Sequence, residues 1–367
     1  MKKSIKKPTA KGTKPSQTVG IDIGDRWCHY CLLNEDGEVM ETGKIRTREK
    51  DLREYFEVHK RMRIAMECGT HSPWISRLLE GLGHEVLVAN ARKIEAITGN
   101  ESKDDDHDAE QLAIFAHFDA RLLHPIQHRS AERQRDLSLL QVRRTLVQAR
   151  TMMINSARGL VKSMGGRLPQ CSSESFEQKT TAAVPANLVG LVTPLLQQVT
   201  LLNEQIKRMD QQIEELKKRY PEILRLRTAP GVGPLVAAAY VLTINGAHSM
   251  IHSRQAGAFL GLRPRRKQSG DSDPQCRITK TGNNYLRALL VQSAHHVLGR
   301  LGPDSALKRW GLKLAASGGQ RGKKRAVVAV ARKLAVILHR MWSSGQNYQP
   351  FPSTAAVGTV TVAGKLA

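Results

Sequence analysis

The stretch Thr18-Val-Gly-Ile-Asp-Ile-Gly24 opens the folded part of this sequence after a polar N-terminal arm. We predict that it forms a strand with Asp22 near its centre and the Asp22 side chain in a cleft. Gly20 and Gly24 flank the carboxylate at a spacing that allows another segment of backbone to approach closely. The N-terminal third is therefore expected to be organised around this strand.

The segments after it alternate between strand and helix. Asn34-Glu-Asp-Gly37 is a hairpin signal. We predict strands at 27–33, 39–45, 63–67 and 84–89, and helices at 48–60, 73–82 and 104–120. Three hairpin-linked strands followed by alternating helix and strand indicate a mixed sheet flanked by helices. This order is typical of a ribonuclease-H-like α/β domain, here over residues 18–127.

Three more carboxylates fall where such a fold would place metal ligands. Glu67 ends the fourth predicted strand, and Asp105 and Asp108 lie three apart on one predicted helix face. Four acids gathered in one cleft repel each other unless a divalent cation neutralises them. With Asp22 they predict a metal site that supports in-line displacement at phosphorus.

Each acid also has a simpler explanation. Asp22 alone could serve a turn, Glu67 alone could pair with an arginine, and residues 104–108 could be an acidic helix start that suits the helix dipole. Asp104 and Asp106 are assigned to that last role. A Gly-x-Asp-x-Gly strand also opens actin-like sugar kinases, but no convincing second phosphate-binding hairpin follows, and the basic charge of the chain argues against that class.

The charge balance indicates a polyanionic partner. Lys and Arg number 57 against 33 Asp and Glu, which gives a net charge of +24. Nucleic acid is the default partner of such a chain, and a merely basic soluble protein is the alternative. Aromatic residues make up only 4%. We therefore expect phosphate contacts, rather than base stacking, to dominate binding.

The compartment follows from what the sequence lacks. No run of about 18 apolar residues is present to span a membrane, and the basic residues 1–17 precede no apolar signal core. We expect 1–17 to be a disordered arm. Five cysteines without a framework fit a reducing, cytoplasmic and nucleoid-associated location. Cys28 and Cys31 form a lone C-x-x-C, for which a zinc site is a minor alternative.

Residues 128–222 are predicted to be helical. Arg143, Arg144 and Arg150 lie between apolar positions of a first long helix and are candidate nucleic-acid contacts. A second helix carries a heptad row formed by Leu195, Val199, Leu202, Ile206, Met209, Ile213, Leu216 and Tyr220. We expect a coiled coil that joins two copies, with a helix packed inside its own domain as the alternative.

Residues 223–343 are predicted to form a mainly helical C-terminal domain. The sequence Pro230-Gly-Val-Gly233 resembles the turn of a helix-hairpin-helix, whose backbone N–H groups can face a phosphate. The last predicted helix starts with the basic residues Arg321, Lys323, Lys324 and Arg325. We expect them to meet nucleic acid, with a solvated face as the alternative. Residues 344–367 are expected to be a disordered tail.

Six blocks of the chain match a known family in the right order. They are GIDIG, MECGTHSPW, KDDDHDAEQLA, PGVGPLVAAA, FLGLRPRRKQSG and RITKTGNNYLRALL. Over residues 18–342 the chain closely resembles the insertion sequence 110/1111 family of transposases, also called DEDD transposases. The usual Lys-Thr-Asp-x-x-Asp-Ala block has Asp104 in place of Thr, which leaves Asp105 and Asp108 in register.

The resemblance implies a RuvC-like N-terminal domain in which the tetrad is catalytic and binds Mg²⁺, or Mn²⁺ in its place. It also implies a C-terminal transposase domain with a serine nucleophile, which here is Ser269, and Ser272 is the competing candidate. Metal would polarise the scissile phosphate while the serine attacks. The residues expected to neutralise phosphate nearby are Arg265, Arg266, Lys267 and Lys280.

The family further implies a structured guide RNA, termed bridge or seeker RNA, that pairs with donor and target DNA. We therefore expect an RNA-guided DNA recombinase that excises its element as a circle. A homodimer or homotetramer is expected because two strands at each of two sites must be exchanged. The alternatives are a Mg²⁺-dependent structure-specific nuclease resembling a junction resolvase, and a non-catalytic nucleic-acid-binding protein.

Overall fold

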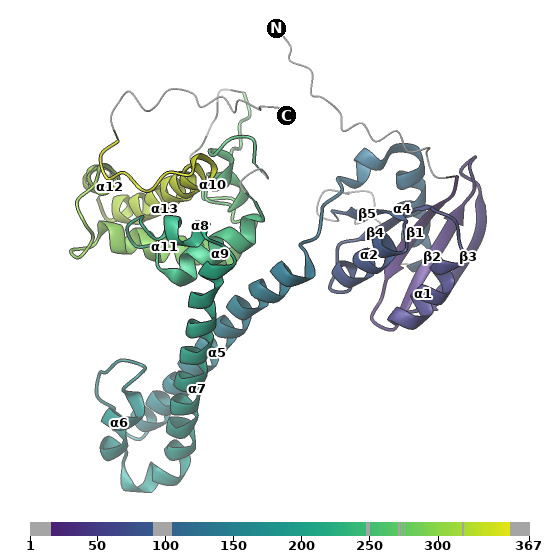
Figure 1. Cartoon of the computed structure of the whole chain (residues 1–367). Coiled ribbons are helices and arrows are strands. Elements are labelled where there is room, and N and C mark those ends of the chain that lie inside the picture. Colours follow the sequence, from purple (N-terminus) through teal and green to yellow (C-terminus); the bar gives the residue numbers. More distant parts are fainter. Residues whose placement is uncertain are drawn as a thin grey trace. The chain divides into compact units, whose positions relative to one another are not determined.

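The computed structural model describes residues 16–90, 105–246, 250–270, 272, 274, 276–317 and 319–352, without the side chains of Asp105 and Gln320 (Figure 1). The chain divides into two compact units, Met1–Ala131 and Glu132–Ala367. Most of the predicted basic arm and of the predicted C-terminal tail lies outside the described residues. In the part of the chain that is described, no helix has the length and apolar character needed to cross a membrane.

The first unit is built on a five-stranded sheet with the order β3-β2-β1-β4-β5. The strands are β1 (Thr18–Ile23), β2 (Trp27–Leu33), β3 (Val39–Arg46), β4 (Arg63–Glu67) and β5 (Glu85–Ala89). The first three form an antiparallel meander, whereas β4 runs parallel to β1 and β5 parallel to β4. Helices α1 (Glu49–Glu57) and α2 (Ser72–Gly81) make the connections. The predicted mixed α/β sheet is confirmed.

The two faces of the sheet have different covers. One face packs against α1 and α2 in a core that includes Val19, Ile21, Leu52, Phe56, Ile75 and Leu79. The other face is covered by α4 (Asp105–Asp119), which continues into the short 3₁₀ helix η2 (Ala120–Leu123). The residues that join α4 to this face are Ala109 and Ala113 against Cys31 and Leu33, and Leu112 and Ala116 against Ala65.

Helix α4 comes closest to the sheet at Gly20. A Cβ atom on this residue would lie 2.0 Å from the carbonyl oxygen of Ala109 and 2.4 Å from the backbone nitrogen of Ala113. No side chain fits at such distances, so the predicted close backbone approach at this glycine is confirmed. Successive side chains of a strand point to opposite faces, so Asp22 lies on the same face as Gly20.

The second unit contains a long antiparallel helical hairpin (Figure 1). It is formed by α5 (Ala131–Ser163) and α7 (Val189–Glu215), with α6 (Phe176–Thr180) and the 3₁₀ helices η3 (Thr181–Ala183) and η4 (Ala186–Leu188) between them. Buried and half-buried residues recur at alternating steps of four and three, as in a heptad. They are Asp136, Leu140, Arg143, Val147, Arg150, Ile154, Ala157 and Val161 on α5, and Val192, Leu196, Val199, Asn203, Ile206, Asp210 and Ile213 on α7.

The heptad row predicted on α7 is therefore only partly right. Its members Val199, Ile206, Ile213, Leu216 and Tyr220 are buried as expected, whereas Leu195, Leu202 and Met209 are half-buried. The positions that face α5 in their place are the buried Leu196 and the half-buried Asn203 and Asp210, which accept hydrogen bonds from arginines of α5. Apolar periodicity missed the true row because two of its members are polar. The partner of this seam is α5 of the same chain, and the joining of two copies stays a prediction.

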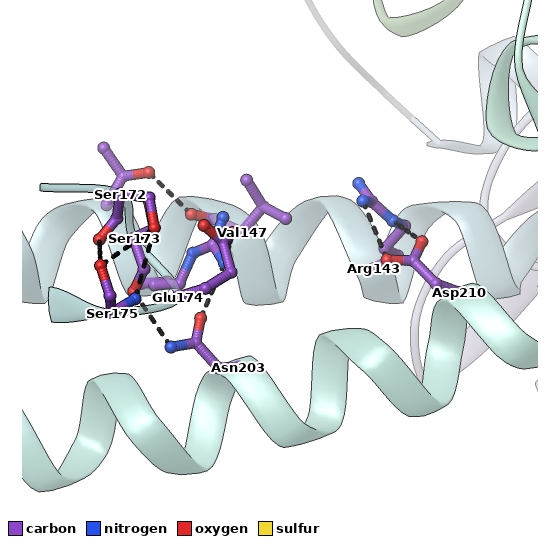
Figure 2. Close-up of polar contacts among 10 residues, drawn as sticks. Arg143, Val147, Ser172, Ser173, Glu174, Ser175, Asn203 and Asp210 are labelled. Carbon is purple, nitrogen blue, oxygen red and sulfur yellow. Dashed lines mark hydrogen bonds and ion pairs between the residues drawn. The ribbon is translucent and has the colours of Figure 1, made fainter. Parts of the chain in front are cut away.

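Two polar layers cross the hairpin. The Arg143 guanidinium donates to both carboxylate oxygens of Asp210, at 2.5 and 3.2 Å, and the two side chains face each other in Figure 2. Two helical turns further along α5, Arg150 donates to the Oδ1 atom of Asn203 at 2.7 Å and to Glu174 at 3.1 Å. The layers are seven residues apart on each helix, so a slipped register would place charges against apolar side chains.

The C-terminal part is helical, as predicted. It comprises η5 (Leu216–Lys218), α8 (Glu222–Leu226), α9 (Pro234–Ile244), α10 (Gln255–Phe259), α11 (Asn284–Leu298), α12 (Ala306–Ala316) and α13 (Gly319–Ser344). The base of the hairpin shares its core, because Leu140 and Ile213 belong to the same buried cluster as α9, α11 and α13. Asp136 is buried there and accepts hydrogen bonds from Arg219 at 2.5 Å and Tyr220 at 2.8 Å.

Replacing Gly20 should destabilise the first unit. In Gly20→Ala the new methyl group collides with the backbone of α4, so we expect a loss of at least about 2 kcal/mol in the free energy of unfolding. Gly81→Ala is the control, because a Cβ on Gly81 meets nothing within 4 Å. Urea unfolding followed by circular dichroism measures both. Equal stability of the two variants would contradict the close packing described here.

Removing Asp210 should loosen the helical hairpin. Asp210→Ala leaves the guanidinium of Arg143, whose side chain is only 20% exposed, without its carboxylate. We expect a loss of about 1–3 kcal/mol in the free energy of unfolding. Glu204→Ala removes an exposed carboxylate from the same helix and should change stability by less than about 0.5 kcal/mol. Thermal unfolding compares the two. A smaller effect of Asp210→Ala than of Glu204→Ala would refute the polar layer.

Candidate active site

Asp22 and Glu67 lie at the same end of two neighbouring parallel strands. The pairing of β1 with β4 runs up to Ile21 opposite Met66, and the two acids are the next residues along each strand. Both side chains are half-buried. Ala65 packs on the face covered by α4, so alternation puts Glu67 on that face together with Asp22. These two predicted site residues are thus brought to one edge of one face.

Helix α4 begins over this edge. Its first residue is Asp105, whose side chain lies outside the described atoms, and Asp108 is half-buried directly before Ala109, which contacts Gly20. The first turn is tied to the sheet by His29, whose Nδ1 atom lies 2.5 Å from the Oδ1 atom of Asp106. His29 is the cross-strand partner of Asp22. The predicted aspartate pair therefore starts the helix that covers Asp22.

Hydrogen bonds shape the loop that follows Glu67. The backbone N–H of Gly69 donates to the Ser72 hydroxyl at 3.0 Å, and that hydroxyl also lies 2.9 Å from His128 Nε2. Trp74 Nε1 donates to the Nδ1 atom of His71 at 3.1 Å. A neutral His71 then carries its proton on Nε2, which lies 3.4 Å from the Asp25 carboxylate. This loop holds a second histidine at the same edge of the sheet.

The two cysteines of the C-x-x-C motif point to opposite faces. Cys28 is buried in the core with α1 and α2, whereas Cys31 packs against α4. Burial raises the pKa of the Cys28 thiol, and the nearby Asp22 carboxylate adds to the rise. Burial also raises the pKa of Cys31 to about 11. Both thiols are therefore core residues, and they do not form a zinc site together.

The carboxylate set suits a hard divalent cation. Asp and Glu oxygens are the ligands that Mg²⁺ prefers, and two of them share the face that α4 covers with Asp108. Among the described side chains, no group of three His, Cys, Asp or Glu residues is close enough to hold a metal ion. That set does not include the side chain of Asp105. The donor chemistry and the shared face, rather than a preformed cage, are what fit the ion.

Ser269 belongs to the second unit and lies at the tip of a small hairpin. Arg265 N–H donates to the Arg277 carbonyl at 2.9 Å, and Ser269 and Ser272 exchange backbone hydrogen bonds of 3.1 and 3.0 Å. Gly270, at φ +55°, makes the turn. The Ser269 side chain is exposed, as are the predicted phosphate contacts Arg265, Arg266, Lys267 and Lys280. The serine is thus presented to solvent within a basic loop.

The three arginines predicted on the first long helix have partners inside the unit. Arg143 and Arg150 form the two polar layers of the hairpin, and only 14% of the Arg150 side chain is exposed. Arg144 donates to Asn284 at 3.1 Å and its guanidinium lies 5.0 Å from the centre of the Tyr285 ring. Their positions explain the spacing of arginines along the helix, and nucleic-acid contact by these residues stays a prediction.

The start of α13 is a concentrated basic surface. Arg321, Lys323, Lys324 and Arg325 are all exposed there. Positive side chains at a helix N-terminus add to the positive end of the helix dipole, which favours an anion at that place. Residues 305–367 contain no Asp or Glu at all, so the sequence around this helix supplies no counter-charge.

Sequence analysis does not single out His29, and it assigns Asp106 only to an acidic helix start. In the structure the Asp106 carboxylate reaches across to His29 on β2. The signal was present in the hairpin register, because counting back from the turn at Gly24–Asp25 places His29 opposite Asp22. What sequence alone could not supply is the direction from which α4 crosses the sheet.

Comparison with known proteins gives a consistent result. The family described as transposase IS116/IS110/IS902 matches residues 224–309, and a transposase family of the IS110 DEDD type matches residues 19–165. The transposase for insertion sequence element IS1111A of Coxiella burnetii is 27% identical over 94% of this chain and 95% of the relative. The transposase for insertion sequence element IS1328 of Yersinia enterocolitica is 26% identical over 80% and 87%.

A probable family 20 transposase of Pseudomonas aeruginosa is 30% identical over 82% of this chain and 89% of the relative. The match to the IS110 DEDD type covers the sheet with its acids, and the match to the IS116/IS110/IS902 family covers part of the helical C-terminal region. The chain therefore belongs to the IS116/IS110/IS902 family of insertion-sequence transposases, which are DNA transposases.

Proposed function

We propose that this transposase cuts and rejoins DNA with two sets of residues, the carboxylates Asp22, Glu67, Asp105 and Asp108 and the serine Ser269. The observation that carries the proposal is the placement of Asp22 and Glu67 on one face, beneath the helix that starts at Asp105. Carboxylates at one edge of the sheet repel each other, and a divalent cation bound there beside a phosphate would relieve that repulsion. The unit would then be RuvC-like.

A divalent cation held by these carboxylates, Mg²⁺ or Mn²⁺, would polarise a phosphoryl oxygen of the scissile phosphate. The Ser269 hydroxyl, exposed on its basic loop, attacks the phosphorus and loses its proton. A bond forms between its Oγ atom and phosphorus, and the bond to one sugar oxygen breaks. That oxygen takes up a proton and leaves as a hydroxyl. Attack by a hydroxyl of another DNA end reverses the step and rejoins the strands.

The basic surfaces supply the electrostatics of this reaction. Arg265, Arg266, Lys267 and Lys280 surround the serine loop and are exposed, so they are the candidates to neutralise phosphate there. The basic start of α13 is a second surface for a nucleic-acid backbone. We assign these surfaces to donor and target DNA and to a structured guide RNA that pairs with both. Arg143 and Arg150 hold the helical hairpin together, and their contact with nucleic acid, like that of Arg144, stays a prediction.

We also propose that the protein acts as a homodimer or homotetramer. Exchange at two sites requires more than one serine, and the helical hairpin offers a surface for association. Leu195, Leu202 and Met209 form a half-buried row beside the seam of α7, and Leu191 and Leu201 are 63% and 47% exposed nearby on the same helix. An apolar row left at the side of a heptad seam favours a coiled-coil contact with a second copy.

Excision in cells tests the two-part site. Cells carrying the chain with its native flanking DNA are sequenced across excised-circle junctions for the wild type, Asp105→Asn, Ser269→Ala and Ser272→Ala. We expect circles in the wild type and in Ser272→Ala, and a loss of at least about 1,000-fold in the other two, because each removes a group that acts in the transition state.

Two other results would contradict this assignment. Circles lost in Asp105→Asn but kept in Ser269→Ala would favour a metal-dependent nuclease that does not use the serine. Circles that persist in both variants would mean that neither the carboxylates nor the serine carries the chemistry, which would favour a non-catalytic binding protein acting beside another enzyme.

The bond between His29 and Asp106 should matter for metal binding. Because it ties the first turn of α4 to the strand beside Asp22, His29→Ala should weaken Mn²⁺ binding roughly tenfold, which is typical for loss of a group that orients metal ligands. Electron paramagnetic resonance of free Mn²⁺ measures the affinity without turnover. His29→Asn, whose amide nitrogen can replace Nδ1, should recover most of it.

His59→Ala is the matched control, because His59 bonds the Tyr55 carbonyl at the end of α1. It should leave Mn²⁺ affinity unchanged. The positioning role is wrong if His29→Ala and His59→Ala bind Mn²⁺ with the same affinity while the wild type binds it.

A further inference from the structure

An exposed tryptophan on the first unit lies close to two cations of the neighbouring strand. Trp27 is 37% exposed. The ammonium nitrogen of Lys44 and the guanidinium carbon of Arg46 each lie 5.2 Å from the centre of its ring. Arg46 is the direct cross-strand partner of Trp27, and Lys44 is the partner of His29. Both cations are exposed. We call these three residues the Trp27 platform.

The Trp27 platform lies on the face that carries the candidate carboxylates. Asp22 pairs with His29 and His29 with Lys44, so all three point to the same side of the sheet. Trp27 is two residues before His29 and shares that side. Neighbouring strands are about 4.8 Å apart, so the backbone of Lys44 lies only about 10 Å across the sheet from that of Asp22. A row of side chains thus leads from the acids to the platform.

Neither platform cation forms a close ion pair within the described part of the chain. Hydrogen bonding to Arg48 lowers the pKa of the Asp51 carboxyl, and the more distant charge of Arg46 adds to that effect. The acids at one end of the row would bind a cation, and the Lys and Arg side chains at the other end would bind an anion. A phosphate bound beside Asp22 through a metal ion continues into a polyanionic strand, and that strand needs cations at its next phosphates.

The aromatic ring favours an unpaired nucleic-acid strand, rather than a duplex, as the ligand of the platform. In a duplex the bases are stacked on each other and present only their edges, whereas a single strand can lay a base on a tryptophan. Lys and Arg beside the ring then contact the flanking phosphates. A purely structural cation–π contact is the simpler explanation, but it gives no reason for the ring and both cations to stand on the same face as the acids.

We propose that the Trp27 platform binds an unpaired stretch of DNA strand and leads it across the sheet to the candidate carboxylates. This inference rests on the proposed function, because it takes the strand to be the DNA that is cut. The platform thereby keeps the strand at the site single-stranded, with one base on Trp27 and its neighbouring phosphates on Lys44 and Arg46. Strand separation at the cut site would then be stabilised by the first unit itself.

Binding of a labelled oligonucleotide tests the platform. The full-length protein is titrated against a fluorescent single-stranded DNA of mixed sequence in EDTA, and anisotropy gives the affinity without cleavage. Trp27→Ala should weaken binding roughly tenfold, as expected for loss of one stacked base. Trp27→Phe keeps a ring and should recover most of the affinity. A duplex of the same sequence should bind both variants as it binds the wild type.

The cations are tested by salt dependence. Lys44→Gln combined with Arg46→Gln should reduce the slope of log affinity against log salt by about 1.4, because each phosphate contact on a single strand contributes about 0.7. The control is Lys60→Gln with Arg61→Gln, which removes the same charge from exposed residues just before β4, at the opposite end of that strand from Glu67. The control should leave the slope nearly unchanged.

Several results would overturn the proposal. Trp27→Ala that binds the single strand as tightly as the wild type would remove the stacking role, and a cation variant no weaker than the control would remove the phosphate contacts. Equal weakening toward duplex DNA would refute the preference for an unpaired strand, and weakening toward an RNA strand alone would replace DNA by RNA. Since EDTA removes metal, these outcomes are independent of whether the carboxylates and Ser269 carry the chemistry.

Discussion

Helix α4 can reach the carboxylate end of β1 only because residue 20 has no side chain. The carbonyl of Ala109 occupies the place where a Cβ of Gly20 would be, and this contact fixes how far along the strand the helix starts. Asp108 immediately precedes Ala109, and Asp105 begins the same helix. One close backbone contact therefore sets the relation between the helix acids and the strand acids. The His29–Asp106 bond adds a second constraint, on the rotation of the first turn.

The same face carries opposite charges that a nucleic acid with its cation can satisfy together. Asp22 and Glu67 lie at the same end of the two central strands β1 and β4, and the cations Lys44 and Arg46 lie on the edge strand β3. In the second unit, exposed basic residues lie around Ser269 and at the start of α13. Like charges that lie close together repel each other and lower the stability of the fold. They are complementary, however, to a phosphate backbone with a divalent ion bound at one phosphate.

Sequence patterns predicted the first unit best where a residue type has a single structural effect, as in apolar alternation, turn residues and glycine. Apolar alternation and the hairpin signal at Asn34–Gly37 predicted the strands of a mixed sheet, and Gly20 predicted the close approach of another backbone segment. The prediction failed where polar residues take core positions. Asn203 and Asp210 occupy the α7 seam because Arg150 and Arg143 pair with them, so a search for apolar periodicity chose Leu202 and Met209 instead.

The candidate site shows the same limit. Asp22 and Glu67 could be placed at one edge from strand order alone, since parallel neighbours end together. The role of His29 depends on which side α4 crosses, and the role of Trp27 depends on cross-strand partners in a hairpin whose register is set by its turn. These are tertiary facts that no local pattern contains. The pairing of Arg143 with Asp210 is a tertiary fact of the same kind, because a paired arginine and an unpaired one look alike in sequence.

The central claim is that carboxylates of the first unit and a serine of the second act on the same phosphate. Trapping the covalent protein–DNA intermediate on the native element end, followed by mass spectrometry of the digested protein, tests it most directly. We predict a nucleotide attached to Ser269 in the wild type, and no adduct in Asp22→Asn. An adduct on Ser272, or an adduct on Ser269 that forms undiminished in Asp22→Asn, would contradict the claim.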